Sequence, residues 1–122
     1  MITAIITAHR KWHKLLNTLE SISRCPNITD CIVVTTGFDR RAAKALAPYL
    51  KKYKATLLDL SNAPSHIAWK AGADAVKTPA VILLHDGDVL SPEFSTIAWQ
   101  TTDNAYVFQA RNITDNWVHK EL

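Results

Sequence analysis

The sequence predicts one α/β domain over residues 1–122, with three layers in the order α/β/α around a mainly parallel sheet of about five strands. Short and nearly continuous apolar runs alternate with segments whose apolar residues recur every three or four positions. Such runs are typical of parallel strands that are buried on both faces. The chain of 122 residues, 48% of them hydrophobic, can also build one core but is short for two domains.

Local patterns predict the first two strands and the helix between them. Residues 2–7 form a β-branched apolar run, which is typical of a strand. Residues 12–22 have a helical period, and Pro26 should end that helix. Residues 31–36 form a second apolar run and predict the second strand. The apolar face of the helix consists of Trp12, Leu15, Leu16, Leu19 and Ile22.

Gly37 and Asp39 then turn the chain into a basic helix between Arg40 and Lys54. We expect Pro48 to kink or split this helix, because proline lacks the N–H group and clashes with the preceding turn. The favoured interpretation is that the basic residues form a solvated helix face. The alternative is a surface that binds a row of phosphate groups. The segment holds six of the fourteen Lys and Arg residues, namely Arg40, Arg41, Lys44, Lys51, Lys52 and Lys54.

The second half is expected to add three strands and two helices. Strands are predicted at residues 56–60, 80–84 and 105–110. Helices are predicted at about 65–76 and 91–100, because capping residues and a proline precede or open each segment. Each crossover between parallel strands passes over one face of the sheet, so we expect helices on both faces.

Composition argues against several classes of protein. Cys25 and Cys31 lack the spacing of a zinc site or a disulfide framework, and we expect reduced thiols. No run approaches the roughly 18 apolar residues of a membrane span, and residues 1–7 lack a basic leader, so a cytoplasmic protein is expected. The net charge of +3 and the pI near 9.0 permit an anionic ligand. The three glycines form no glycine-rich phosphate loop, so a nucleotide would need other partners for its phosphates.

The carboxyl ends of the predicted strands are polar, and open α/β sheets bind their ligands at that edge. The sharpest signal is the run His85-Asp86-Gly87-Asp88, which follows the most apolar strand. Asp86 and Asp88 can direct two hard oxygen ligands toward one Mg²⁺ or Mn²⁺, and Gly87 allows the backbone to curve. The alternative is an ordinary Asp-Gly turn, in which Asp88 or Ser91 caps the next helix.

Residues 3–10, 31–37, 62–72 and 83–94 carry four short motifs in a consistent order along the chain. Together they resemble family 2 glycosyltransferases, which transfer sugars from nucleotide diphosphates on a GT-A fold. Residues 83–94 (LLHDGDVLSPEF) resemble the strand, acidic cluster and Leu-Ser-Pro-Asp-Phe segment of that family. Residues 3–10 (TAIITAHR) resemble its opening strand and nucleotide turn. Residues 31–37 are similar to its second strand, which usually ends in Asp-Asp-Gly, and residues 62–72 to its Ala-Arg-Asn-Ala-Gly helix. The resemblance covers about residues 2–110 and implies the Rossmann-like, nucleotide-binding half of the GT-A fold.

The resemblance implies a site for a nucleotide-diphosphate sugar, with a UDP-sugar favoured, and Mn²⁺ or Mg²⁺ as cofactor. His9 stands where an aromatic residue often stacks on the base, and Thr35 stands where an Asp commonly contacts the nucleotide. Lys70 would help to neutralise the phosphates. His85 stands where a further Asp can occur, and imidazole suits Mn²⁺ better than Mg²⁺. The implied nucleotide-binding residues are Thr7, Ala8, His9, Arg10, Thr35, Lys70 and Asp86, and the implied metal ligands are Asp86 and Asp88.

Family members usually continue well beyond the acidic cluster, so this chain is expected to lack most of the half that holds the acceptor and the catalytic base. A transferase that acts on a glycan, a protein or modified DNA, and that completes its site as a homo-oligomer, is one interpretation. A noncatalytic module that binds nucleotide sugars is the second, and a module that binds nucleic acid or protein through the basic helix is the third. The candidates in the tail are Asp103, Asp115, His119 and Glu121 for the base, and Trp117 for acceptor stacking or an oligomer contact.

Overall fold

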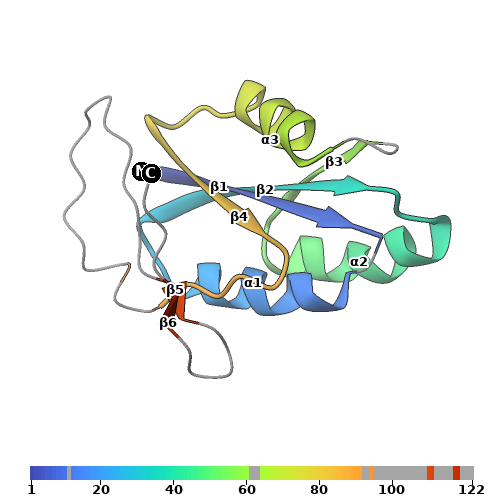
Figure 1. Ribbon diagram of the computed structural model, residues 1–122, viewed down its shortest axis with the longest axis horizontal. Coiled ribbons are helices and arrows are strands. Elements are labelled where there is room, and N and C mark those ends of the chain that lie inside the picture. Colours follow the sequence, from blue (N-terminus) through green and yellow to red (C-terminus); the bar gives the residue numbers. More distant parts are fainter. Residues whose placement is uncertain (11, 61–63, 92–93, 95–109, 112–116, 119–122) are drawn as a thin grey trace.

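The computed structural model describes residues 1–10, 12–60, 64–91, 94, 110–111 and 117–118. Four strands and three helices alternate from Ile2 to His85, and two short strands follow (Figure 1). The elements in chain order are β1 (Ile2–His9), α1 (His13–Ser23), β2 (Ile28–Thr36), α2 (Arg40–Lys52), β3 (Thr56–Leu60), α3 (Ser65–Asp74), β4 (Ala80–His85), β5 (Ala110–Arg111) and β6 (Trp117–Val118).

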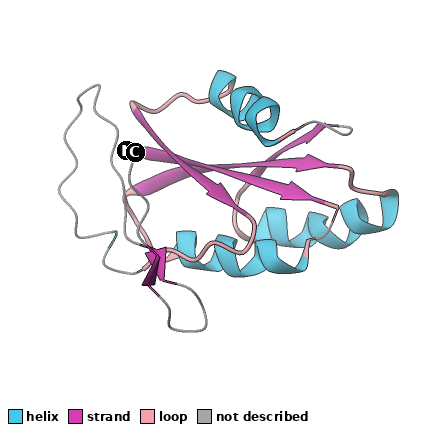
Figure 2. Ribbon diagram, viewed as in Figure 1, coloured by secondary structure: helices cyan, strands magenta, loops and turns pink. Residues whose placement is uncertain are grey.

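The main sheet is parallel and has the strand order β3-β2-β1-β4. Helices α1 and α2 lie on one face of this sheet and α3 lies on the other (Figure 2). Every strand therefore points its carboxyl end toward the same edge, where β1, β2 and β4 end side by side. The predicted three-layer α/β fold is confirmed.

The number of strands differs from the expected five. In the described part of the chain the main sheet has four strands, and β5 pairs with β6 in an antiparallel sheet of their own. Residues 105–109 of the predicted fifth strand lie outside the described residues. Its last residue, Ala110, pairs with Val118, which is only eight positions later. The backbone of Ala110 therefore pairs with a nearby antiparallel strand instead of with the main sheet.

The expectation that Pro48 splits the basic helix is wrong. α2 runs as one helix from Arg40 to Lys52 with Pro48 inside it. Leu46 and Leu50 on either side of the proline are buried against the sheet, and this packing holds the helix together across the missing hydrogen bond. The Asp39 carboxylate caps the helix by accepting a hydrogen bond from the Ala42 N–H at 2.7 Å. All six basic residues of the segment are exposed, as a solvated face requires.

The core has two layers, one on each face of the sheet. Ile6 and Val33 face α1 and α2, whereas Ile5 and Val34 face α3. α3 packs closely on β1 at Gly72, where an added Cβ atom would lie 2.5 Å from Ile5 Cγ2. Glycine is therefore required at this contact, and it lets α3 lie directly on the central strands beside the polar edge.

The chain after β4 returns to the N-terminal part of the molecule. Phe94 is buried beside Ile2 and Cys25, and its carbonyl oxygen accepts a hydrogen bond from Asn27 Nδ2 at 3.2 Å. The rest of the helix predicted at residues 91–100 lies outside the described residues, apart from Ser91. Within the ranges that the structure describes, no helix has the length and apolar character to cross a bilayer.

Candidate nucleotide site

An open pocket of about 330 Å³ lies at the carboxyl edge of the main sheet, between the ends of β1, β2 and β4 and the start of α3. Four of the predicted nucleotide-binding residues line it: Thr7, Ala8, His9 and Asp86. The remaining lining residues are Thr36, Pro64, Ala68 and His85. The pocket thus lies where parallel α/β sheets place their ligands.

Two histidine–threonine pairs form the floor of this pocket. His85 Nδ1 and Thr7 Oγ1 share a hydrogen bond of 3.1 Å between β4 and β1. His9 Nδ1 and Thr36 Oγ1 share one of 2.8 Å between β1 and β2. Both pairs join residues that are directly opposite each other in the parallel register, so the strand pairing itself orients the two imidazole rings.

Trp69 on α3 supports the His85 ring from the other side. The ring centroids of Trp69 and His85 are 4.6 Å apart with an interplanar angle of 54°. The imidazole of His85 is therefore contacted both by the Thr7 hydroxyl and by the indole of Trp69.

The turn formed by Asp86, Gly87 and Asp88, called the acidic turn below, begins as an extension of the sheet. The Asp86 N–H donates to the Thr7 carbonyl oxygen at 2.9 Å, which continues the pairing of β4 with β1 by one residue. Gly87 then has a φ of +92°, in the left-handed region that glycine adopts at little cost. The Asp88 carboxylate accepts a hydrogen bond from the His85 N–H at 2.9 Å, so this side chain closes its own turn.

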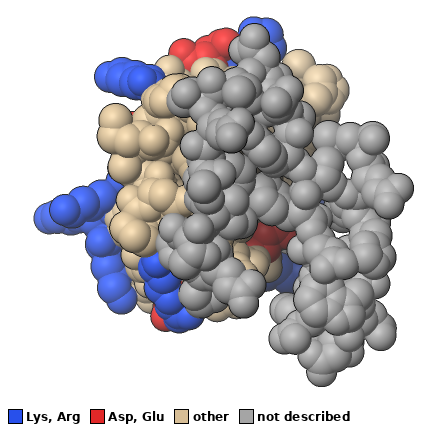
Figure 3. Space-filling view, turned by 90° about the vertical axis from the view of Figure 1, so that its left-hand side faces the viewer, with Lys and Arg blue, Asp and Glu red and all other residues tan. Residues whose placement is uncertain are grey.

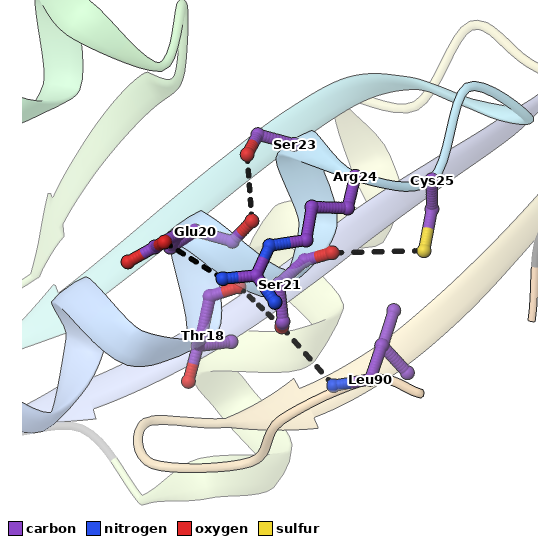
Figure 4. A network of polar contacts seen from close by, with 7 residues as sticks. All are labelled: Thr18, Glu20, Ser21, Ser23, Arg24, Cys25 and Leu90. Carbon is purple, nitrogen blue, oxygen red and sulfur yellow. Dashed lines mark hydrogen bonds and ion pairs between the residues drawn. The ribbon is translucent and has the colours of Figure 1, made fainter. Parts of the chain in front are cut away.

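Helix α1 holds the acidic turn through two buried hydroxyl groups. The Gly87 N–H donates to Thr18 Oγ1 at 2.9 Å, and the Leu90 N–H donates to Ser21 Oγ at 3.0 Å. Ser21 Oγ also donates to the Thr18 carbonyl oxygen at 2.8 Å, so the hydroxyl is engaged on both sides (Figure 4). Backbone N–H groups of the turn that would otherwise be left unpaired are satisfied in this way.

Sequence reasoning did not assign Thr18 and Ser21 to the site. The available signal was that both fall on the buried face of α1, among Leu15, Leu19 and Ile22. Polar residues at buried helix positions need partners, and here the partners are the backbone of the acidic turn.

Asp86 is the half-buried carboxylate of the site. Burial raises the pKa of its carboxyl group, and the nearby positive charge of Lys14 opposes that rise. Asp88 raises the pKa of Asp86 further, because two carboxylates in one turn repel each other. The turn therefore favours a cation beside it.

Three predicted nucleotide-binding residues do not line the pocket. Thr35 is buried on the opposite face of β2 from Thr36, and its hydroxyl donates to Asp59 Oδ1 at 2.9 Å. Lys70 forms an exposed ion pair with Asp74 at 3.3 Å along α3. Arg10 is exposed just beyond β1, with a φ of +62°, and its N–H donates to the Thr36 carbonyl oxygen at 3.0 Å.

The donor set at the turn suits one kind of metal site. Among the described residues, no three His, Cys, Asp or Glu side chains are grouped for a metal ion. Asp86 and Asp88 offer two carboxylates, of which one oxygen is engaged by the His85 N–H. Mg²⁺ at nucleotide sites is commonly held by one or two carboxylates and completes its shell with water and phosphate oxygens. The residues thus fit an ion that arrives with a diphosphate, rather than a closed protein cage.

The comparisons with known proteins agree with this fold. No family model and no curated protein matches the chain. A crystal structure of Staphylococcus aureus TarS, residues 1–349, superposes with a TM-score of 0.67 over 78% of this chain, at 12% sequence identity. A second TarS structure gives a TM-score of 0.55 over 72% of the chain, at 14% identity. The chain covers 30% and 17% of those two structures, respectively. The chain therefore has a fold like that of the glycosyltransferase TarS, and at this identity the likeness is one of fold alone.

Proposed function

We propose that this chain binds a nucleotide-diphosphate sugar, with a UDP-sugar favoured, as the donor-binding part of a glycosyltransferase. The observation that carries the proposal is the position of Asp86, a half-buried carboxylate that lines the same pocket as Thr7 and His9. A nucleoside in that pocket would place its phosphates toward the acidic turn. The fold shared with TarS supports the same assignment.

The pocket residues divide into two groups in this proposal. Thr7, Ala8 and His9 contact the base and ribose, with Arg10 at the rim beyond them. Asp86 and Asp88 hold Mn²⁺ or Mg²⁺, which when bound neutralises the charge that develops on a departing diphosphate. Thr35 and Lys70 stay outside the proposed contact set, because Asp59 and Asp74 engage their polar groups.

Transfer to an acceptor requires a base within hydrogen-bond reach of the acceptor hydroxyl. The candidates Asp103, Asp115, His119 and Glu121 lie outside the described residues. The proposal for the described residues is therefore donor binding, and transfer is the activity of the glycosyltransferase to which they would contribute.

Calorimetric titration of UDP, GDP and UDP-glucose, with and without Mn²⁺, tests the proposal. The wild type should bind UDP only with the metal, and the double variant Asp86→Ala with Asp88→Ala should lose this binding while it remains folded. Asp30→Asn is the matched control, because Asp30 is an exposed carboxylate at the start of β2. Absence of nucleotide binding to the wild type, or unchanged binding by the double variant, would overturn the proposal.

A further inference from the structure

Lys14 lies across the acidic turn from the side of α1. A Cβ atom added at Gly87 would meet Cδ of Lys14 at 3.4 Å and its Cβ at 3.5 Å, so the aliphatic part of the lysine lies beside the turn on the side that a Gly87 side chain would occupy. Its charge also acts on Asp86, where it opposes the effect of burial on the carboxyl pKa. Lys14 is thus the basic residue whose position is tied both to Gly87 and to Asp86.

The positive charge of Lys14 does not stabilise helix α1. Lys14 is exposed in the first turn of α1, where the helix dipole disfavours cations, and that turn contains no acidic residue. The ion pairs found among the described residues are Arg24–Glu20 and Lys70–Asp74, and neither involves Lys14. The Lys and Arg side chains that are visible in Figure 3 stand in several separate groups rather than in one continuous patch. The ammonium group of Lys14 is therefore available to a ligand.

Charge balance at the site calls for such a group. Two carboxylates already cancel the formal charge of one divalent cation, so a diphosphate that this ion coordinates still brings negative charge that the turn does not compensate. We propose that Lys14 is a phosphate-binding residue, whose ammonium group contacts the diphosphate of a nucleotide held at the Asp86-Gly87-Asp88 turn. This inference rests on the proposed function. It assigns to Lys14 the neutralisation of the phosphates that the family resemblance implied for Lys70.

Lys14→Met tests the assignment, because methionine keeps the packing on Gly87 and removes the charge. With Mn²⁺ present, we expect UDP affinity to fall about tenfold, the effect of losing one charge-assisted hydrogen bond. Uridine, measured by NMR titration, should bind the variant and the wild type equally. Mn²⁺ without nucleotide should bind the variant at least as tightly, because a neighbouring positive charge has gone. Lys14→Arg should retain most of the UDP affinity.

Lys44→Met on α2 is the matched control and should bind UDP as the wild type does. Unchanged UDP affinity in Lys14→Met would overturn the assignment and leave the proposed function standing. Equal losses for uridine and UDP would also overturn it, since they would indicate a structural role. A wild type that binds no UDP would overturn the proposed function and this assignment together.

Discussion

The Gly87 N–H donates a 2.9 Å hydrogen bond to the hydroxyl of Thr18, which is fully buried on α1. This bond joins the middle of the acidic turn to a helix that lies 69 positions earlier in the chain. The position of the Asp86 and Asp88 carboxylates therefore depends on α1 as well as on β4.

Thr18→Val keeps the shape of the side chain but removes the acceptor for Gly87. We expect the free energy of unfolding to fall by about 1–3 kcal/mol, because a partly buried N–H loses its partner. UDP affinity in the presence of Mn²⁺ should fall as well, since the turn loses one of its attachments. Urea unfolding and calorimetry measure the two effects.

Thr18→Ser is the control for this change, because it keeps the hydroxyl and loses a methyl group. It should bind UDP as tightly as the wild type does. Equal UDP affinities for the Val and Ser variants would show that the hydrogen bond does not position the turn.

The sequence predicted the layers of the fold well because its strands are apolar on both faces. The run Ile2 to Thr7 and the run Cys31 to Thr36 are buried almost throughout, so neither admits a surface helix or an edge strand as an alternative. The failures have local causes. Pro48 lies between Leu46 and Leu50, whose packing outweighs the preference of proline for a break, and Ala110 finds a partner in a nearby hairpin.

The candidate site was predictable where its residues follow directly from strand ends. Thr7, His9 and Asp86 line the pocket because parallel strands bring their carboxyl ends to one edge. Thr35, which the family resemblance implied for the site, does not line the pocket, because strand alternation turns its side chain to the other face of β2, toward Asp59. The position of Lys14 beside Gly87 could not be predicted, because it depends on how α1 packs beside the turn and no local pattern contains that information.

Gly72→Ala should destabilise the fold without removing any group from the pocket. The new methyl would lie 2.5 Å from Ile5 Cγ2, so α3 or β1 has to move, and the expected loss is about 1–3 kcal/mol in the free energy of unfolding. Ile5→Ala removes the opposing atom. In that background the additional cost of Gly72→Ala should shrink, and a cost that stays the same would place the clash elsewhere.

The free energy of unfolding should decrease at high pH because of the buried thiol of Cys31. Burial raises the pKa of this thiol from 9.0 to about 12, so the unfolded chain releases the proton at a lower pH than the folded protein does. The stabilising contribution is fully present below about pH 9 and is lost as the pH rises toward about 12, at roughly 1.4 kcal/mol per pH unit. Urea unfolding at several pH values in this window measures the slope.

Cys31→Ala supplies the comparison. It should be less stable than the wild type at neutral pH, because it leaves a small cavity, and the difference should narrow as the pH rises. A difference that stays constant up to pH 11 would contradict the assignment of the slope to Cys31.

Asp88 has two roles that substitution can separate. Its carboxylate accepts the His85 N–H at 2.9 Å, which is a structural role that a neutral amide oxygen also fills. The proposed metal site needs its negative charge. Asp88→Asn should therefore keep the free energy of unfolding within about 0.5 kcal/mol of the wild type and lose most of its affinity for Mn²⁺ in the presence of UDP.

Asp88→Ala should lose both the turn contact and the metal, at an added cost of about 1 kcal/mol in stability. If Asp88→Asn binds Mn²⁺ and UDP normally while Asp88→Ala does not, the carboxylate serves only to close the turn. The metal would then depend on Asp86, and Asp88 would contribute only the hydrogen bond that closes the turn at the end of β4.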